Sequence, residues 1–396
     1  MHLNLIPTKS DKLAGLFLKP WRLISTLVVS LVAIAICITV YFGYSAYSLF
    51  SPEYTRLYSD TGFNQITDQF CKSSLSQFQG SPFIRQNLSN GFDAGQYTGS
   101  TPALNNMQSL SNLRVIAIST KGSDAPKPMC KWTLFSAALN KIPLELYGSS
   151  EFFQKGLLVN KGKPDEGLAS KRDCTLSVLC AAAASSMNDA VLMIDAYDII
   201  FQRPFEELQY LYYKRWNAPE FVVSAEENCY PSEVDGVCGD VTTRPRVPPG
   251  GSSFVNSGVL IGKPEAFIDA IGLTGKFRDM GIYNDQAALA KVVYENYKTR
   301  PFMLDHLSEL SSAAYPPKPL YKEVEIGGRT YFVDATSKGI PMMIHLNGGI
   351  PKERATNLWY MDGEKLRDDL KEEVQNYPIF LEDKLVTVGE LCPDYF

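Results

Sequence analysis

The chain has 396 residues, of which 45% are hydrophobic and 20% charged, and its formal net charge is −5. This composition is typical of a globular protein and not of a disordered one, and the length allows one large domain or two ordinary ones. The negative net charge gives no reason to expect a nucleic-acid-binding protein.

The N-terminal region predicts a membrane anchor. Residues 23–43 contain no charged side chain, and basic residues precede this run but do not directly follow it. Such a run is long enough to cross the hydrocarbon core of a bilayer, and the positive-inside rule places residues 1–22 in the cytosol. The alternative is a cleaved signal peptide, whose apolar region is normally shorter, about 7–15 residues. We expect a single-pass type II protein of the Golgi or endoplasmic reticulum membrane, with residues 44–110 as a lumenal stem.

Seven of the eight cysteines follow the predicted anchor. The lumen permits disulfides, and an odd number leaves at least one thiol free or paired between chains. A disulfide-linked homodimer and a non-covalent homodimer therefore both stay open. Cys229 and Cys238 bracket a short loop, where a local disulfide is expected. Asn87-Leu-Ser89 is an N-glycosylation sequon, which is consistent with a lumenal glycoprotein.

Residues 111–365 alternate between strand and helix patterns. We predict strands at 113–119, 144–147, 191–194, 221–225, 254–262 and 340–345, and helices at 130–139, 173–187, 204–212, 264–271 and 284–297. This order is typical of an α/β domain with a mostly parallel sheet flanked by helices. Residues 366–396 are charged, and we expect them to form a peripheral C-terminal extension.

The strand at 191–194 ends in two carboxylates, Asp195 and Asp198. Residues three apart point to different faces of a regular strand, so these two converge only if the backbone turns there. In open α/β sheets this end of a strand is where ligands bind. Two convergent carboxylates with no Lys or Arg between them suit Mn²⁺ or Mg²⁺. The alternative is a solvent-exposed turn, in which Asp is common.

Two further strand ends carry polar residues that could join such a site. His345 ends the strand at 340–345 and would complete an open site of two carboxylates and one imidazole, although a lone histidine is more often structural. Thr120 ends the first strand in a Gly-containing turn, which suits a nucleotide contact or simply the end of a strand. The sequence has no Walker A loop, no G-x-S-x-G elbow and no G-x-G-x-x-G after the first strand.

Six short motifs occur in order along the chain: Asp195-Ala-Tyr-Asp198, Ser224-Ala-Glu226 with Cys229-Tyr-Pro231, Val255-Asn-Ser-Gly258, Asn284-Asp-Gln286, Leu304-Asp-His-Leu307 and His345-Leu-Asn-Gly348. Over residues 110–360 this set resembles the glycosyltransferase domain of the procollagen lysyl hydroxylases and their collagen glucosyl- and galactosyltransferase relatives. The hydroxylase domain of that family has no counterpart in the sequence. The resemblance implies a GT-A fold, a UDP-sugar donor and Mn²⁺ or Mg²⁺.

The resemblance also implies roles for individual residues. It makes Asp195, Asp198 and His345 the metal ligands, places Tyr197 against the uracil, and makes Asn256 and Asp285 the residues that face the transferred sugar and the acceptor. The expected contacts to the rest of the donor are Asn347, Gly348, Lys352 and Lys171. The sequence departs from the family at Asn284-Asp285, where the family has a run of aspartates, and at Tyr230, where it has tryptophan.

The expected function is transfer of a hexose from a UDP-sugar to a hydroxyl group on a protein or glycan acceptor, similar to procollagen galactosylhydroxylysine glucosyltransferases. One alternative is a transferase that acts on a lipid or polysaccharide acceptor. Another is a catalytically inactive, sugar-binding pseudoenzyme of the same fold. The presence of Asp195 and Asp198 together with His345 favours an enzyme, because a scaffold needs none of the three.

Overall fold

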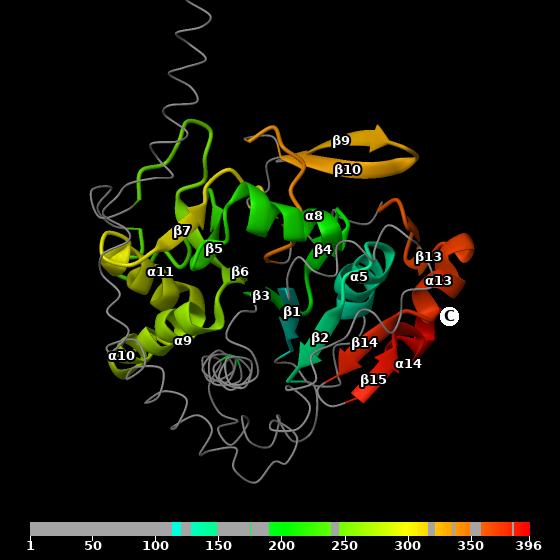
Figure 1. The fold of residues 1–396 in the computed structure, drawn as a ribbon, viewed down its shortest axis with the longest axis horizontal. Helices are drawn as coiled ribbons and strands as arrows, with labels where there is room; N and C mark the ends of the chain where they lie inside the picture. The colour runs from blue at the N-terminus through cyan, green and yellow to red at the C-terminus, as the bar shows by residue number, and fades with distance from the viewer. Residues whose placement is uncertain are drawn as a thin grey trace, which may run out of the picture. The chain divides into compact units, whose positions relative to one another are not determined.

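The computed structural model describes residues 113–119, 128–148, 175, 190–238, 245–315, 321–334, 337–348, 358–381 and 384–396. These residues form a mixed α/β fold with a large central sheet, as expected (Figure 1). The predicted tail, anchor and stem at 1–110, and the predicted helix at 173–187 apart from Thr175, lie outside them. Within the described part, no helix is long and apolar enough to cross a membrane.

The central sheet has eight strands, which lie in the order β15 (Lys384–Thr387), β14 (Pro378–Leu381), β2 (Leu144–Tyr147), β1 (Leu113–Ile118), β3 (Ala190–Asp195), β6 (Phe254–Gly262), β5 (Phe221–Glu226) and β7 (Phe302–Asp305). Strands β6 and β15 are antiparallel to their neighbours, and the other strand pairs are parallel. The sheet is therefore mixed and mostly parallel, as the alternation of strands and helices predicts.

Helices cover both faces of this sheet. Alternate side chains of β1 enter two separate hydrophobic clusters, with Val115 and Ala117 in one and Ile116 and Ile118 in the other. Burial on both faces explains why the central strands are continuous apolar runs. The first cluster includes residues of η5 (Met129–Leu134), α5 (Phe135–Leu139), α8 (Phe205–Tyr210) and η6 (Leu211–Arg215), and the second includes residues of α9 (Pro264–Leu273), α10 (Gly275–Asp279) and α11 (Asp285–Asn296).

A second, three-stranded sheet joins segments that are far apart in the sequence. Its strands lie in the order β4 (Ile199–Phe201), β11 (Met343–His345) and β8 (Ser311–Ala313). Strand β3 ends at Asp195, and the backbone bends over residues 196–198 before it enters β4, which is the turn that the two carboxylates require. Strand β11 pairs antiparallel with β4, so that His345 lies opposite Ile199. This register places His345 beside Asp198.

The remaining elements are a hairpin and several short helices and strands. A hairpin of β9 (Tyr321–Ile326) and β10 (Arg329–Asp334) is attached through Gln202, whose side chain donates to Phe332 O (3.2 Å) and accepts from Phe332 N (2.7 Å) (Figure 1). The other short elements are β12 (Met361–Asp362), β13 (Lys365–Leu366), η8 (Asp368–Leu370), α13 (Lys371–Gln375), α14 (Val388–Leu391) and η9 (Pro393–Tyr395).

The expectation of a peripheral extension at 366–396 is wrong. Strand β14 pairs in parallel with β2 and thereby extends the central sheet, and a disulfide joins Cys392 to Cys130 in η5. Ile379 and Val388 are fully buried, but each stands among charged or half-exposed residues, so the segment shows no clear hydrophobic period. The local disulfide expected between Cys229 and Cys238 is confirmed.

Candidate active site

Asp195, Asp198 and His345 converge where β3, β4 and β11 meet. His345 Nε2 lies 3.6 Å from an oxygen of Asp195 and 3.4 Å from an oxygen of Asp198. One ligand atom from each of the three residues lies within 4.8 Å of the others, which is a spacing that one metal ion could bridge. The sequence predicts this grouping. The bend after β3 and the register of β11 on β4 bring the three residues together.

The donor set fits a divalent ion such as Mn²⁺ or Mg²⁺. It offers two carboxylates and one imidazole, and the 26% exposure of the Asp195 side chain leaves one side open for oxygens of a substrate. Burial by itself lowers the pKa of His345, but the carboxylates of Asp198, Asp195 and Glu226 outweigh it and raise the pKa overall. The site is thus strongly negative, as a cation site must be.

Gly258 makes room for the imidazole ring. A Cβ atom on Gly258 would lie 2.1 Å from Cε1 and 2.5 Å from Nδ1 of His345, closer than real Cβ contacts come. Strand β6 therefore supports the ring of His345 directly, and only glycine leaves space for it at this position.

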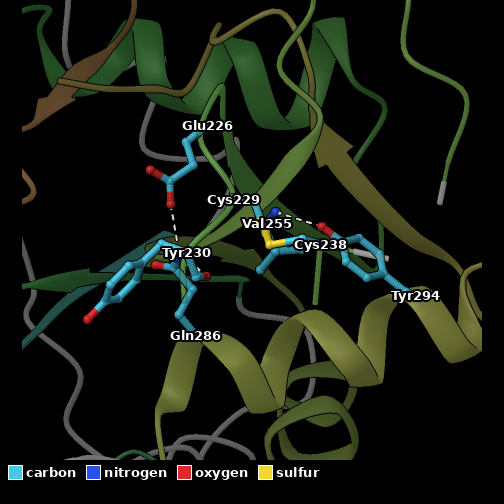
Figure 2. Close-up of a disulfide and its surroundings, with 7 residues drawn as sticks. All are labelled: Glu226, Cys229, Tyr230, Cys238, Val255, Gln286 and Tyr294. Atoms are coloured by element: carbon cyan, nitrogen blue, oxygen red, sulfur yellow. Dashed lines mark hydrogen bonds between the residues drawn. A yellow bond between two sulfur atoms is a disulfide. The ribbon is translucent and has the colours of Figure 1, made fainter. Parts of the chain in front are cut away.

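A buried carboxylate, Glu226, gathers three amide side chains beside the cluster of Asp195, Asp198 and His345. Its Oε1 accepts hydrogen bonds from Asn256 (3.2 Å) and Gln286 (2.6 Å), and its Oε2 accepts one from Asn347 (3.0 Å). Burial raises the pKa of Glu226, and the three amide hydrogen bonds oppose this shift. Figure 2 shows Gln286 at the start of α11 reaching towards Glu226, next to the Cys229–Cys238 disulfide.

Asn256 connects this amide cluster to the metal ligands. Its Oδ1 lies 2.9 Å from His345 Nδ1 and also accepts a hydrogen bond from Gly258 N (3.0 Å). Asn256 is only 1% exposed. Asp285, the other residue predicted to face the sugar and the acceptor, is half-buried at the first position of α11, where it accepts a hydrogen bond from Ser257 Oγ (3.3 Å).

The predicted donor contacts divide into two groups. Tyr197 lies in the bend between β3 and β4, and its hydroxyl is hydrogen-bonded to Ser119 at the end of β1. Asn347 and Gly348 follow β11, with Gly348 in the left-handed region at φ 85°. The other predicted contacts, Thr120, Lys171 and Lys352, lie outside the described residues.

Sequence reasoning assigned no role to Glu226 or Gln286, although both belong to the motifs that carry the resemblance. The structure shows that they contact each other and bring together the ends of β5 and β6 and the start of α11. A signal was present in the sequence, since Glu226 ends a buried strand in the same way as Asp195 does.

The motif Leu304-Asp-His-Leu307 has a structural role in this chain. The carboxylate of Asp305 accepts hydrogen bonds from three successive backbone N–H groups, those of residues 309–311, and burial raises its pKa to about 7. His306 Nδ1 lies 2.7 Å from the carbonyl oxygen of Ser252, and Ser252 N donates to His306 O (2.7 Å). The motif thus holds the turn after β7 and the loop before β6.

The family match defines the class of protein as a glycosyltransferase. More narrowly, residues 109–359 match the family described as the PLOD GT domain, and the chain belongs to this family. The match confirms the resemblance carried by the six motifs.

Solved structures that resemble the chain include two glycosyltransferases of low similarity. One is a glycosyltransferase involved in the glycosylation of the major capsid of PBCV-1, with 12% identity over 61% of this chain and 97% of that chain, at a TM-score of 0.35. The other is mouse xyloside xylosyltransferase 1 in its apo form, with 13% identity over 60% and 97%, at a TM-score of 0.36. No curated protein matches the chain.

Proposed function

We propose that this protein is a metal-dependent glycosyltransferase that moves a hexose from a UDP-sugar to a hydroxyl group on a protein or glycan acceptor. The observation that carries the proposal is the cluster of Asp195, Asp198 and His345, placed at strand ends in a chain of the PLOD GT family. A purely structural role would not explain why this cluster of two carboxylates and one imidazole is partly open to solvent.

The chain's own groups would hold and orient the donor. A divalent ion bound at the cluster would neutralise the negative charge of a departing diphosphate. Asp195 and Asp198 supply charge, and His345 supplies a nitrogen ligand whose ring is fixed by Gly258.

The remaining donor contacts follow from their positions around the cluster. We propose that Tyr197 stacks on the uracil, since it lies in the bend between β3 and β4, between the two aspartates in the sequence. The backbone at Asn347 and Gly348 directly follows β11 and would run along the phosphates. The φ of 85° at Gly348 lies in the left-handed region, which favours glycine. Thr120, Lys171 and Lys352 are proposed as the further donor contacts.

Asp285 is proposed as the residue nearest the reacting carbon. It is half-buried, it opens α11, and Ser257 fixes its carboxylate through the 3.3 Å hydrogen bond. Asn284 caps the same helix by accepting from Ala287 N (2.9 Å), so that the backbone that carries Asp285 is held in place.

We also propose that residues 23–43 anchor the protein in the Golgi or endoplasmic reticulum membrane, with the catalytic domain in the lumen. Support comes from the uncharged run and its basic flank, and from the two disulfides of the described part, which require an oxidising compartment. A homodimer, disulfide-linked or non-covalent, remains the proposed oligomer.

The test is UDP release by the purified full chain against a panel of UDP-sugars, with Mn²⁺ or with EDTA. We expect release from one donor that requires Mn²⁺ and falls roughly 100-fold or more in Asp195→Ala, because the diphosphate then loses its charge stabilisation. The matched control is Asp362→Ala, an exposed carboxylate in β12. Turnover that persists in EDTA would contradict the metal assignment. Absence of both turnover and UDP binding would contradict the proposed activity.

A further inference from the structure

We propose that Asn256 is a positioning residue that holds His345 in its Nδ1-protonated tautomer, and that Glu226 and the β6 backbone fix the orientation of Asn256. The inference rests on the proposed function in one respect, namely that the free Nε2 of His345 serves a metal ion. It gives Asn256 a role different from the sugar contact that the family resemblance implies.

Each of the three amides around Glu226 is oriented by a backbone N–H group. Asn256 Oδ1 accepts from Gly258 N (3.0 Å), Gln286 Oε1 accepts from Ser257 N (3.4 Å), and Asn347 Oδ1 accepts from Tyr315 N (3.1 Å). A backbone N–H can only donate, so in each amide the oxygen is the atom that faces it. The three NH₂ groups must then be the atoms that face Glu226.

The contacts with Glu226 lead independently to the same orientations. Three NH₂ groups point at its two oxygens, and an ionised carboxylate is the side chain that accepts from all of them. If the amide of Asn256 were turned over, its oxygen would face the carboxylate and its NH₂ would face Gly258 N. Both contacts would be repulsive, and both groups are buried, where such a mismatch is costly.

The hydrogen bond with Asn256 fixes the position of the proton on His345. Asn256 Oδ1 lies 2.9 Å from His345 Nδ1, and an amide oxygen can only accept a hydrogen bond, so Nδ1 carries the proton. In the neutral ring Nε2 then bears the lone pair, and Nε2 is the nitrogen that faces Asp195 and Asp198. A metal-ligating histidine commonly gains its orientation in this way, from an acceptor on its other nitrogen.

The burial of Asn256 agrees with this role. Its side chain is 1% exposed, and both polar atoms are used inside the protein, Oδ1 by His345 and Gly258 and Nδ2 by Glu226. Oδ1 already accepts two hydrogen bonds, and burial keeps the second N–H of Nδ2 away from a sugar hydroxyl. Asn256 therefore acts on the reaction through His345.

The test compares the full-length wild type with Asn256→Leu and Asn256→Asp, which have nearly the same size. Leucine removes the acceptor, whereas aspartate keeps an acceptor oxygen next to His345 and, protonated on its other oxygen, can still donate to Glu226. Nitrogen-15 NMR of the metal-free proteins, at a pH above the raised pKa of His345, where the ring is neutral, reports which nitrogen is protonated. The chain has only three histidines, so spectra of His2→Gln and His306→Gln assign the His345 signals.

We expect Nδ1–H for His345 in the wild type and in Asn256→Asp, and loss of that single tautomer in Asn256→Leu. Calorimetric titration with Mn²⁺ alone should show affinity lowered roughly 10- to 100-fold in Asn256→Leu and largely kept in Asn256→Asp. If the leucine variant does not fold, the wild-type tautomer and the aspartate variant still decide the matter.

The inference would be overturned by an Nε2–H tautomer in the wild type, or by wild-type tautomer and Mn²⁺ affinity in Asn256→Leu. A lower donor affinity in Asn256→Leu without either change would favour the sugar contact and overturn it as well. Failure of the proposed function looks different. A wild type that shows Nδ1–H but binds no Mn²⁺ would support the tautomer assignment while contradicting the metal site.

Discussion

The ring of His345 and the backbone of Gly258 occupy space that no further side chain could share. A Cβ on Gly258 would approach three ring atoms within 2.1–2.7 Å, and all three belong to a ring that is 4% exposed. The ring could avoid the clash only by moving away from Asn256 or from the two aspartates. The glycine and the metal cluster therefore depend on each other.

Gly258→Ala should consequently lower Mn²⁺ affinity and also destabilise the fold by about 1–3 kcal/mol, which is the usual effect of overpacking a buried site. Calorimetry with Mn²⁺ and urea unfolding would measure the two effects. Gly339→Ala is the matched control, because its Cβ would meet only Ser337 Oγ, at 3.7 Å. Unchanged Mn²⁺ affinity in Gly258→Ala would show that the ring is not the ligand.

The sequence predicts the grouping of Asp195, Asp198 and His345 that the structure shows, but it does not predict the residues that orient them. Asp195, Asp198 and His345 stand at strand ends, and strand ends can be located from hydrophobic runs. The partners of Glu226 cannot be located in this way, since they come from three separate segments and depend on the exact approach of β6, α11 and the residues after β11. Side-chain networks of this kind are a property of packing.

At the scale of elements, the small sheet does most to form the site. Strands β4, β8 and β11 have three residues each, which is too short for a periodic pattern to be recognised. Their pairing nevertheless sets the distance between His345 and Asp198, and Leu346 N donates to Asp198 O (2.7 Å) to close the contact. The strand predicted at 340–345 was correct in place but too long, because its first residues lack partners in the sheet.

The loop at 245–253 is held to the turn after β7 by His306, and this attachment should depend on pH. Burial lowers the pKa of His306, and its hydrogen bond with Ser252 opposes this only in part. The unfolded chain therefore binds a proton more readily than the folded one below about pH 6.5, and stability should fall as the pH drops below that value.

Urea unfolding at about pH 7 and about pH 5 would measure this effect, with His306→Gln as the comparison, since glutamine does not titrate. We expect the wild type to lose more stability than the variant on acidification, by at most about 1.4 kcal/mol per pH unit. Other titrating groups, His345 included, are common to both proteins and cancel in the difference. Equal pH dependence in the two would show that His306 is not buried as described.

At the scale of the whole molecule, the α/β class and the mostly parallel sheet could be predicted, because buried parallel strands alternate with helices in the sequence. The place of the C-terminal segment could not. Strand β14 joins the sheet by pairing with β2, more than two hundred residues earlier in the chain, and β15 joins it by pairing with β14. Long-range pairing leaves little trace in local composition.

The disulfide that joins the C-terminal segment to η5 should contribute more to stability than the local one. Cys130 and Cys392 are 262 residues apart in sequence, whereas Cys229 and Cys238 are 9 apart. A crosslink stabilises a protein mainly by restricting its unfolded chain, and the restriction grows with the size of the closed loop. The long link also fixes η5 and α5 to the C-terminal segment, where Phe135 packs on Tyr395 with ring centroids 5.1 Å apart.

Replacing both Cys130 and Cys392 by alanine should therefore lower the free energy of unfolding by roughly 2–5 kcal/mol. The double alanine variant of Cys229 and Cys238 should lose less, because its loop is short. Denaturant unfolding under non-reducing conditions would compare the two variants with the wild type. A larger loss from the short loop would mean that the C-terminal strands are held by sheet pairing and aromatic packing, and that the disulfide adds little. The expected order instead makes the Cys130–Cys392 bond the main link between the two ends of the described fold.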